Sequence, residues 1–362
     1  MPDFANLRKA LLHQSEPDRV PLFEGSIHED IKSEFLGRPV KDLESEAAFW
    51  MKAGYDYAPL TVGLRQIIRG ELDGLMGVTD VETTVLKPAE ARYNPFREET
   101  SVRMWAEEGE GIITDEKAFD AFPWPKAEAF NYTALDQITS YLPPGAKAIV
   151  NVGYIFMATW MLMGLETFCT ALADNPDLVG KVFERVGTIQ EEVVRIVLDY
   201  DCVGALRMPD DMAYTTGLIV SPDAMRRHVF PWHKRIGDLV HKKGLPYLLH
   251  SDGQLYEVLD ALIDCGYDGI HPIEPAAMDI AYLKREYGDR LSLCGNIDLG
   301  YTLTRGKPEE VEEEVKIRLR EIAPGGGYGV GSSNSIPEYV PYENYMAMRE
   351  SVLRYGRYPI QL

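Results

Sequence analysis

Polar and ionisable residues follow the apolar runs in the second half of the chain, at the points where buried strands would end. The clusters are Asp210 with Asp211, His250 to Asp252, His271 with Glu274, Cys294 with Asn296 and Asp298, and Ser332 to Asn334. In a barrel of parallel strands the carboxyl ends open on one face, which is where the active sites of such barrels lie. We therefore expect one shared ligand site at that face.

Four of these residues carry side chains that ligate metals: His250, Asp252, Glu274 and Cys294. Imidazole, carboxylate and thiolate suit zinc, which needs its ligands at about 2.0–2.3 Å. An alternative interpretation makes His250 a hydrogen-bonded structural residue and Cys294 a small buried hydrophobe. The residue types alone leave both interpretations open.

Composition sets the broad class of the chain. Of 362 residues, 45% are hydrophobic and 26% are charged, which are globular values that exclude disordered, collagenous and disulfide-scaffold proteins. The net charge of −20 argues against binding to nucleic acid or to an anionic membrane surface. Four cysteines without a CxxC pair, and an N-terminus without the apolar core of a signal peptide, favour a cytoplasmic location.

Strand-like and helical runs alternate along the chain. The expected strands are Val20–Glu24, Tyr55–Val62, Lys147–Tyr154, Cys202–Met208, Pro246–His250, Gly269–Ile273, Leu291–Ile297 and Gly327–Ser332. The expected helices are Leu43–Ala53, Glu166–Ala173, Pro176–Tyr200, Ser221–Lys243, Leu255–Cys265, Asp279–Tyr287, Pro308–Ile322 and Tyr342–Tyr355. The alternation predicts parallel strands joined by helical crossovers, in a closed barrel or an open doubly wound sheet. The number of strands favours an α/β fold of the (β/α)8 TIM-barrel type.

One region breaks this rhythm, from about residue 63 to residue 144. Val81–Leu86 and Thr100–Thr114 alternate as strands do, and Gly109 to Gly111 is a turn signal. We expect a single domain over residues 1–362, with this insertion packing over one end of the barrel. The uncharged stretch Ala148–Leu165 is expected to be a buried strand and a buried helix rather than a membrane span.

Several motifs together resemble the uroporphyrinogen decarboxylase superfamily. They are His-Ser-Asp-Gly at 250–253, Gly-Ile-His-Pro-Ile-Glu-Pro at 269–275, Gly-Asn-Ile-Asp at 295–298, Gly-Ser-Ser-Asn-Ser-Ile-Pro at 331–337 and Pro-Tyr-Glu-Asn at 341–344. The resemblance covers roughly residues 140–357 and implies a (β/α)8 barrel. It is much less specific for activity.

Within that superfamily, the chain departs from the decarboxylases at its N-terminus. Decarboxylases carry an arginine-rich segment that grips a polycarboxylate, whereas the stretch Leu22–His28 contains Glu24 and no arginine. The coenzyme M branch of the corrinoid-dependent methyltransferases binds zinc through a His-x-Cys pair, a later Cys and a Glu. Here His250 and Glu274 fit that pattern, while Asp252 replaces the first Cys and Ser332 or Ser333 the later one. The pattern looks more like the methyltransferases of O-demethylases.

This resemblance implies transfer of a methyl group from a methoxylated substrate, with an aromatic ether as the expected class, to the Co(I) corrinoid of a partner protein. The chain lacks the Asp-x-His-x-x-Gly motif that would bind the corrinoid itself. The predicted catalytic residues are His250, Asp252, Asp210 and Asp211, and the predicted substrate-binding residues are Met157, Tyr214, Asn296, Ser333 and Asn334. Zinc is the expected metal, held by His250, Asp252, Glu274 and Cys294. A homodimer is a further expectation.

Two other classes of function also agree with the sequence. A cofactor-independent decarboxylase would place arginines at the barrel mouth, for which Arg65, Arg69 and Arg207 are the candidates. A non-catalytic binding barrel would hold His250 and Asp252 by hydrogen bonds to the backbone, without an open site.

Overall fold

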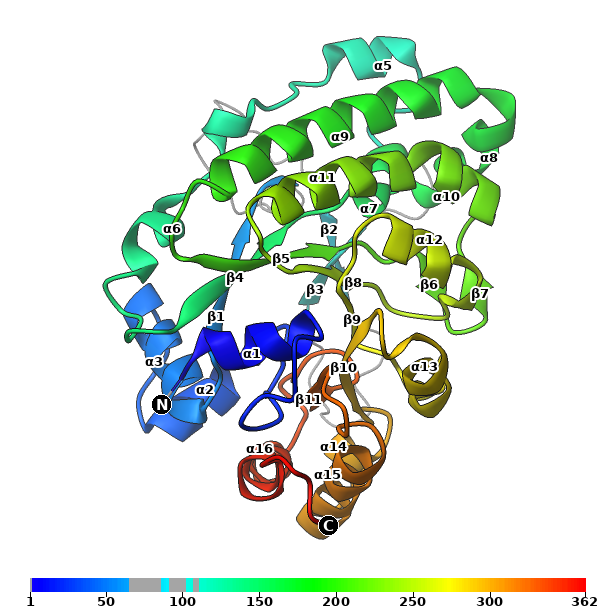
Figure 1. The fold of residues 1–362 in the computed structure, drawn as a ribbon. Coiled ribbons are helices and arrows are strands. Elements are labelled where there is room, and N and C mark those ends of the chain that lie inside the picture. The colour runs from blue at the N-terminus through cyan, green and yellow to red at the C-terminus, as the bar shows by residue number, and fades with distance from the viewer. Residues whose placement is uncertain (1, 65–85, 91–101, 107–110) are drawn as a thin grey trace.

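The protein is described by a computed structural model that covers residues 2–64, 86–90, 102–106 and 111–362. Its centre is a curled, parallel, seven-stranded sheet in the order β1-β4-β5-β8-β9-β10-β11 (Figure 1). The strands are β1 (Tyr57–Val62), β4 (Lys147–Val152), β5 (Val203–Pro209), β8 (Tyr247–His250), β9 (Gly269–His271), β10 (Ser292–Ile297) and β11 (Tyr328–Ser332).

The strand order follows the chain order without a reversal. A doubly wound sheet would change direction at a switch point, so the order excludes that alternative and fits barrel-type winding. The predicted first strand, Val20–Glu24, is not a ladder strand, because it meets β11 through the isolated bridge between Leu22 and Val330. The structure thus shows seven of the eight expected strands.

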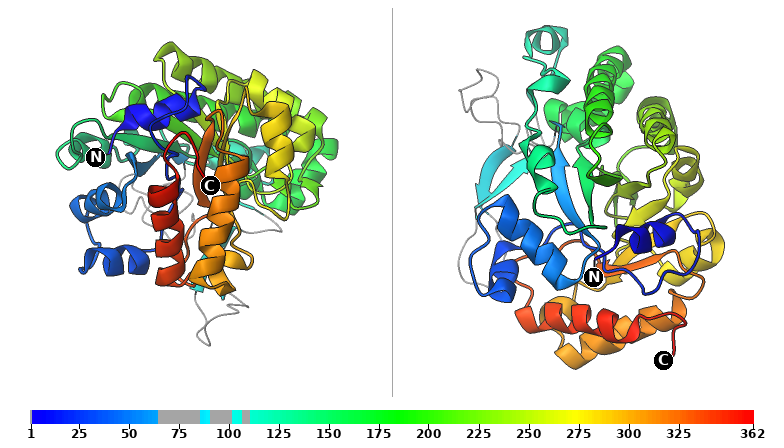
Figure 2. Two further views of the ribbon diagram at one scale, coloured as in Figure 1. Left: turned by 60° about the horizontal axis from the view of Figure 1, so that its bottom comes forward. Right: turned by 60° about the vertical axis from the view of Figure 1, so that its left-hand side comes forward.

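Helices cover the outside of the sheet (Figures 1 and 2). Those between or after the strands are α7 (Phe156–Met163), α8 (Leu165–Asp174), α9 (Pro176–Val197), α10 (Pro222–His228), α11 (Phe230–Lys242), α12 (Leu259–Asp264), α13 (Ile280–Tyr287), α14 (Thr302–Arg305), α15 (Pro308–Glu321) and α16 (Tyr342–Tyr355). α9 and α11 pack together on one flank, and α15 and α16 pack together on the opposite flank.

The N-terminal third supplies smaller elements. They are α1 (Phe4–Leu11), α2 (Glu29–Leu36), α3 (Leu43–Ala53), the antiparallel pair β2 (Leu86–Glu90) and β3 (Val102–Ala106), α5 (Glu116–Ala121), the short helix η2 (Ala127–Ala129) and α6 (Thr133–Ile138). α1 lies against the amino ends of the strands, since the hydroxyl of Ser292 donates to the carbonyls of Ala10 and Leu11. This places α1 opposite the face on which the polar clusters lie.

One predicted helix differs from the structure, and two predicted strands include residues that the structure does not describe. The helix expected over Ser221–Lys243 breaks at Val229, because Pro231 in the first turn of α11 has no N–H to continue the hydrogen-bond ladder. β2 begins at Leu86, where the prediction had the strand end, and residues 81–85 lie outside the described part. β3 is shorter than the predicted Thr100–Thr114. Much of the insertion is outside the described residues, so its packing over one barrel end stays an expectation.

The predicted burial of the uncharged stretch is confirmed. In β4, every residue after Lys147 is buried, and most of α7 is buried as well. Within the described residues no single helix has the length and apolarity to cross a membrane; α7 and α8, which meet at a bend of 97°, pass such a test only as a pair.

The gap between β11 and β1 is bridged by side chains as well as backbone. The Tyr57 hydroxyl of β1 accepts from the Glu24 N–H at 2.8 Å and donates to the Glu24 carbonyl at 2.7 Å. On the other side, Phe23 donates its N–H to the Val330 carbonyl at 2.8 Å. The segment containing Glu24 therefore connects the two edge strands of the sheet.

The Glu24 carboxylate strengthens the same junction. It is fully buried and accepts from the N–H of Ser332 at 2.6 Å and from the Ser332 hydroxyl at 2.8 Å. Burial raises its pKa to about 8, while these hydrogen bonds and the charge of Arg207 act in the opposite direction. The interior of the sheet thus holds a carboxyl group that takes up a proton near neutral pH.

We predict that Tyr57→Phe lowers the free energy of unfolding by about 2–4 kcal/mol, because two buried backbone groups lose their partner. Urea unfolding measures the change. Tyr55→Phe is the matched control, since the Tyr55 hydroxyl is buried in the same aromatic cluster and has no partner of good geometry among the described residues. Equal losses in both variants would contradict the proposed role of the Tyr57 hydroxyl.

We also predict a pH dependence that comes from Glu24. Because its pKa is raised from the ordinary 4.5 to about 8, the folded state holds a proton that the unfolded state releases between those values. The free energy of unfolding should fall as the pH rises through that window, by roughly 5 kcal/mol. Glu24→Gln should flatten this slope in urea unfolding at several pH values. Glu321→Gln, at an exposed position, should leave the slope as in the unsubstituted protein.

Candidate functional site

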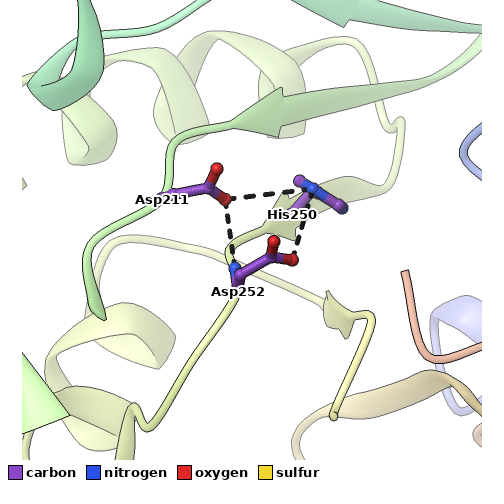
Figure 3. Close-up of side chains that lie close together, drawn as sticks. All are labelled: Asp211, His250 and Asp252. Atoms are coloured by element: carbon purple, nitrogen blue, oxygen red, sulfur yellow. Dashed lines mark hydrogen bonds and ion pairs between the residues drawn. The ribbon is translucent and has the colours of Figure 1, made fainter. Parts of the chain in front are cut away.

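The register of three neighbouring strands aligns the polar clusters. Pro209 of β5 pairs with His250 of β8, and His250 pairs with His271 of β9. The residues just past β5 and β8 therefore leave the sheet at the same level. Figure 3 shows the outcome, in which the side chains of Asp211, His250 and Asp252 point toward one another.

These three residues form a compact group of potential metal ligands. One ligand atom from each lies within 4.8 Å of the others. The Nε2 atom of His250 is 3.9 Å from Oδ1 of Asp211 and 3.8 Å from Oδ1 of Asp252. The side chains of His250 and Asp252 are 19% and 34% exposed, so the group is open to a small molecule from one side. One nitrogen and two carboxylates match the donor types of catalytic zinc sites.

Hydrogen bonds from the backbone N–H groups of the loop that carries Asp252 hold this loop against neighbouring residues. Its successive N–H groups are bound at 2.7–3.0 Å: those of residues 251 to 254 donate to the His271 carbonyl, Asp211 Oδ1, Glu274 Oε2 and the Tyr214 carbonyl. Gly253 has a φ of +82°, and a Cβ there would lie 2.4 Å from a backbone oxygen. Only glycine fits this turn, which explains its place in the His-Ser-Asp-Gly motif.

The Asp252 carboxyl has one engaged oxygen and one unpaired oxygen. Its Oδ2 accepts from the Asn334 side-chain amide at 2.8 Å, whereas Oδ1 is buried without a hydrogen-bond partner among the described residues and lies 3.8 Å from Nε2 of His250. Burial, followed by the charges of Asp211 and Glu274, raises the Asp252 pKa to about 8. Such a carboxyl group gains from a proton or a cation at Oδ1.

His271 was missed as a site residue, although it lies beneath the group. Its Nδ1 is 2.8 Å from the Nδ1 of His250, and the two rings stack at 5.0 Å. His271 is buried, and burial, together with the charges of His250 and Arg207, holds its pKa well below the ordinary value. The signal that could have found it is a pair of histidines in two consecutive predicted strands, His250 at the end of one and His271 within the next.

Asp210 has a different role from its neighbour. Its oxygens accept from the N–H groups at the start of α7, those of Ile155, Phe156 and Met157, at 2.8–3.2 Å. His233 lies 3.0 Å from the same carboxylate. The structure places the predicted catalytic residue Asp210 as a buried carboxylate that caps a helix, apart from the group formed by Asp211, His250 and Asp252.

Two predicted metal ligands do not join the group. Cys294 is buried inside the sheet, and burial raises the pKa of its thiol to about 12, which opposes the thiolate that a metal needs. Cys294 is thus not among the residues that the structure brings together as potential ligands. Glu274 lies next to the group but uses Oε2 to accept from Gly253. Asp211, predicted as catalytic only, takes the third position.

The predicted substrate-binding residues are divided by the structure. Asn296 is buried and both ends of its amide are engaged, with the Ile273 carbonyl and with Arg318. Ser333 is buried and its hydroxyl accepts from the Leu299 N–H. These two residues serve the fold. The other three are less buried. Met157 lies at the start of α7, Tyr214 is 58% exposed, and Asn334 donates its side-chain amide to Asp252.

Of the three arginines expected for a decarboxylase, the structure describes Arg207. Arg207 is buried and donates to the Asn151 side chain at 2.6 Å and to the Gly25 carbonyl at 3.2 Å. Arg65 and Arg69 lie outside the described residues. The binding-barrel alternative expected His250 to be bonded to backbone, whereas the two nitrogens of this ring face another imidazole and two carboxylates.

Residues 110–355 match the profile of a known family, uroporphyrinogen decarboxylase (URO-D). This chain belongs to the URO-D family. The match covers more than half of the chain and contains all the strands of the sheet except β1. It confirms the superfamily that the motifs predicted.

Curated relatives cover both branches of the family, over short alignments. The methylcobamide:CoM methyltransferase MtaA of Methanosarcina barkeri is 29% identical over 134 residues, which is 36% of this chain and 36% of that protein. The uroporphyrinogen decarboxylase of Mannheimia succiniciproducens is 26% identical over 129 residues, 34% of this chain and 35% of that one. The chain thus aligns with about a third of the length of these relatives.

The fold has a solved counterpart. A methyltransferase from Methanosarcina mazei superposes with a TM-score of 0.64, over 96% of this chain and 97% of that one, at 17% identity. At this identity the likeness supports the architecture, and it fits the curled parallel sheet.

We predict a large loss of stability for one of two adjacent substitutions and a small change in stability for the other. Asp210→Asn should lower the free energy of unfolding by about 2–4 kcal/mol, because an amide NH2 would face N–H donors of α7. Asp211→Asn should stay within about 1 kcal/mol, since its side chain is partly exposed at the open group. Thermal and urea unfolding measure both. A larger loss for Asp211→Asn than for Asp210→Asn would refute this division of roles.

Proposed function

We propose that this protein is a corrinoid-dependent methyltransferase, which moves a methyl group between a small molecule at the Asp211–His250–Asp252 group and the corrinoid of a partner protein. The observation that carries the proposal is the convergence of one imidazole nitrogen and two carboxylates at the open ends of the strands. The kinship with methylcobamide:CoM methyltransferases supports the reaction class.

The group fits zinc by its donor set. Three protein ligands with one open side correspond to a catalytic zinc site, and the buried, unpaired Oδ1 of Asp252 is an atom that a cation would satisfy. Bound there, zinc would act as a Lewis acid toward an oxygen of the substrate. The residues that would hold it are Asp211, His250 and Asp252, with no thiolate. The replacement of thiolates by carboxylates favours an oxygen substrate over a thiol.

For the methyl donor we propose a methoxylated compound, with an aromatic ether as the preferred class. The corrinoid of the partner protein would supply the electron pair that accepts the methyl group, and the carbon–oxygen bond of the ether would break. The electron pair of the broken bond stays on the ether oxygen, which needs a proton or a positive charge to leave. Asp252 is suited to provide that proton, because its pKa of about 8 keeps it protonated near neutral pH in the absence of a cation.

We predict that the purified protein binds about one zinc ion per chain and that His250→Ala abolishes this binding. Metal analysis after dialysis against a zinc buffer measures the stoichiometry. The same variant should lose methyl transfer from methoxylated substrates to Co(I) corrinoid by about 10²–10⁴-fold, because the departing oxygen loses its support.

The matched control is His241→Ala, since His241 lies on the outer helix α11 and pairs with Asp268 away from the site. It should leave both measurements unchanged. Full methyl transfer by His250→Ala would refute the proposed site. Release of CO2 from a polycarboxylate by the unsubstituted protein, without corrinoid, would instead identify it as a decarboxylase.

A further inference from the structure

The two nitrogens of His250 face different surroundings. Nε2 faces the carboxylates of Asp211 and Asp252, at 3.9 and 3.8 Å. Nδ1 faces the Nδ1 of His271 at 2.8 Å. Nitrogens this close share one proton, so one ring donates and the other accepts. Which ring donates decides whether His250 presents a lone pair or an N–H to the carboxylates.

We infer that His271 is a positioning residue, which accepts the Nδ1 proton of His250 and so keeps the lone pair of His250 on Nε2, toward the metal group. This inference rests on the proposed metal site and adds a residue to it. His271 does not face the carboxylates, and it would act only through its neighbour.

The chemistry of a neutral imidazole requires such a partner. The ring carries one N–H and one lone pair, so ligation through Nε2 leaves the proton on Nδ1. A buried N–H without an acceptor costs about 1–3 kcal/mol. Metal-binding histidines commonly donate their second N–H to a carboxylate, a carbonyl or water, which fixes both the tautomer and the ring orientation. In this chain another imidazole occupies that place.

The surroundings of His271 favour its role as a neutral acceptor. It is 2% exposed and packs against the ring of Phe23 at 5.4 Å. The charged group that acts on it from β5 is Arg207, which disfavours a further positive charge on the ring. When Nδ1 accepts, the His271 proton sits on Nε2, which is buried and without a partner among the described residues. The Nε2 of His271 has no hydrogen-bond partner among the described residues in either tautomer, so the assignment rests on the lone pair that ligation requires at Nε2 of His250.

Two substitutions separate the acceptor from the ring. His271→Asn keeps an acceptor, because the asparagine Oδ1 lies near the position of the histidine Nδ1, and His271→Phe keeps the planar ring without an acceptor. Competition with a chromophoric chelator measures zinc affinity. We expect His271→Phe to weaken zinc binding by about 10–100-fold, and His271→Asn to stay close to the unsubstituted protein. His241→Phe is the control for loss of a histidine elsewhere.

A second measurement does not depend on the variants. Nitrogen-15 NMR of the zinc-loaded, unsubstituted protein should show a protonated Nδ1 on His250 and a metal-bound Nε2. If His271→Phe fails to fold, this spectrum still decides the tautomer.

The outcomes separate this inference from the proposed function. Absence of zinc binding by the unsubstituted protein would refute the metal site and the inference together. Zinc binding that is equal in His271→Phe and the unsubstituted protein, or a protonated Nε2 on His250 in the loaded protein, would refute the role of His271 and leave the metal site standing.

Discussion

The candidate site depends on the parallel register of β5, β8 and β9. Because Pro209, His250 and His271 lie side by side across these strands, the residues that follow β5 and β8 leave the sheet at one level. A shift of one residue in β8 would turn His250 to the other face of the sheet and separate it from Asp211. The backbone hydrogen bonds of the loop after His250 then fix Asp252 against the same point. The convergence of Asp211, His250 and Asp252 is thus a consequence of strand pairing and of the hydrogen-bonded loop.

Two adjacent aspartates at the end of β5, Asp210 and Asp211, point in different directions and make different contacts. Asp210 turns inward, caps α7 and meets His233, whose other nitrogen lies 3.0 Å from the Tyr267 hydroxyl. Asp211 turns to the open face and meets His250. The hydrogen bonds from the first N–H groups of α7 to Asp210 fix the point at which this helix begins, and with it the position of Met157. The two residues look alike in the sequence because successive side chains differ only in direction, which residue type does not encode.

Much of the fold could be predicted from the sequence, because hydrophobic alternation and caps are local signals. Tyr342–Tyr355 is helical over the predicted range, and Ser221 caps its helix as expected. The position of Cys294 could not be predicted, since its direction depends on which neighbours fill the sheet interior. Glu24 was predicted only as a substrate-repelling charge. Its burial between two edge strands depends on the distant residues Tyr57 and Ser332, which no local pattern connects to it.

Charge decides what the site can hold. Asp211, Asp252 and Glu274 bring three carboxyl groups together beside one imidazole, and burial together with the charges of the other two carboxylates raises the pKa of Asp252. Such a group is relieved either by a proton on Asp252 or by a metal ion at its unpaired Oδ1. In the proposed reaction a protonated Asp252 would donate its proton to the departing ether oxygen, whereas a bound cation would stabilise the negative charge on that oxygen. Proton and cation therefore compete for the same oxygens, and each equips the site for cleavage of the same bond.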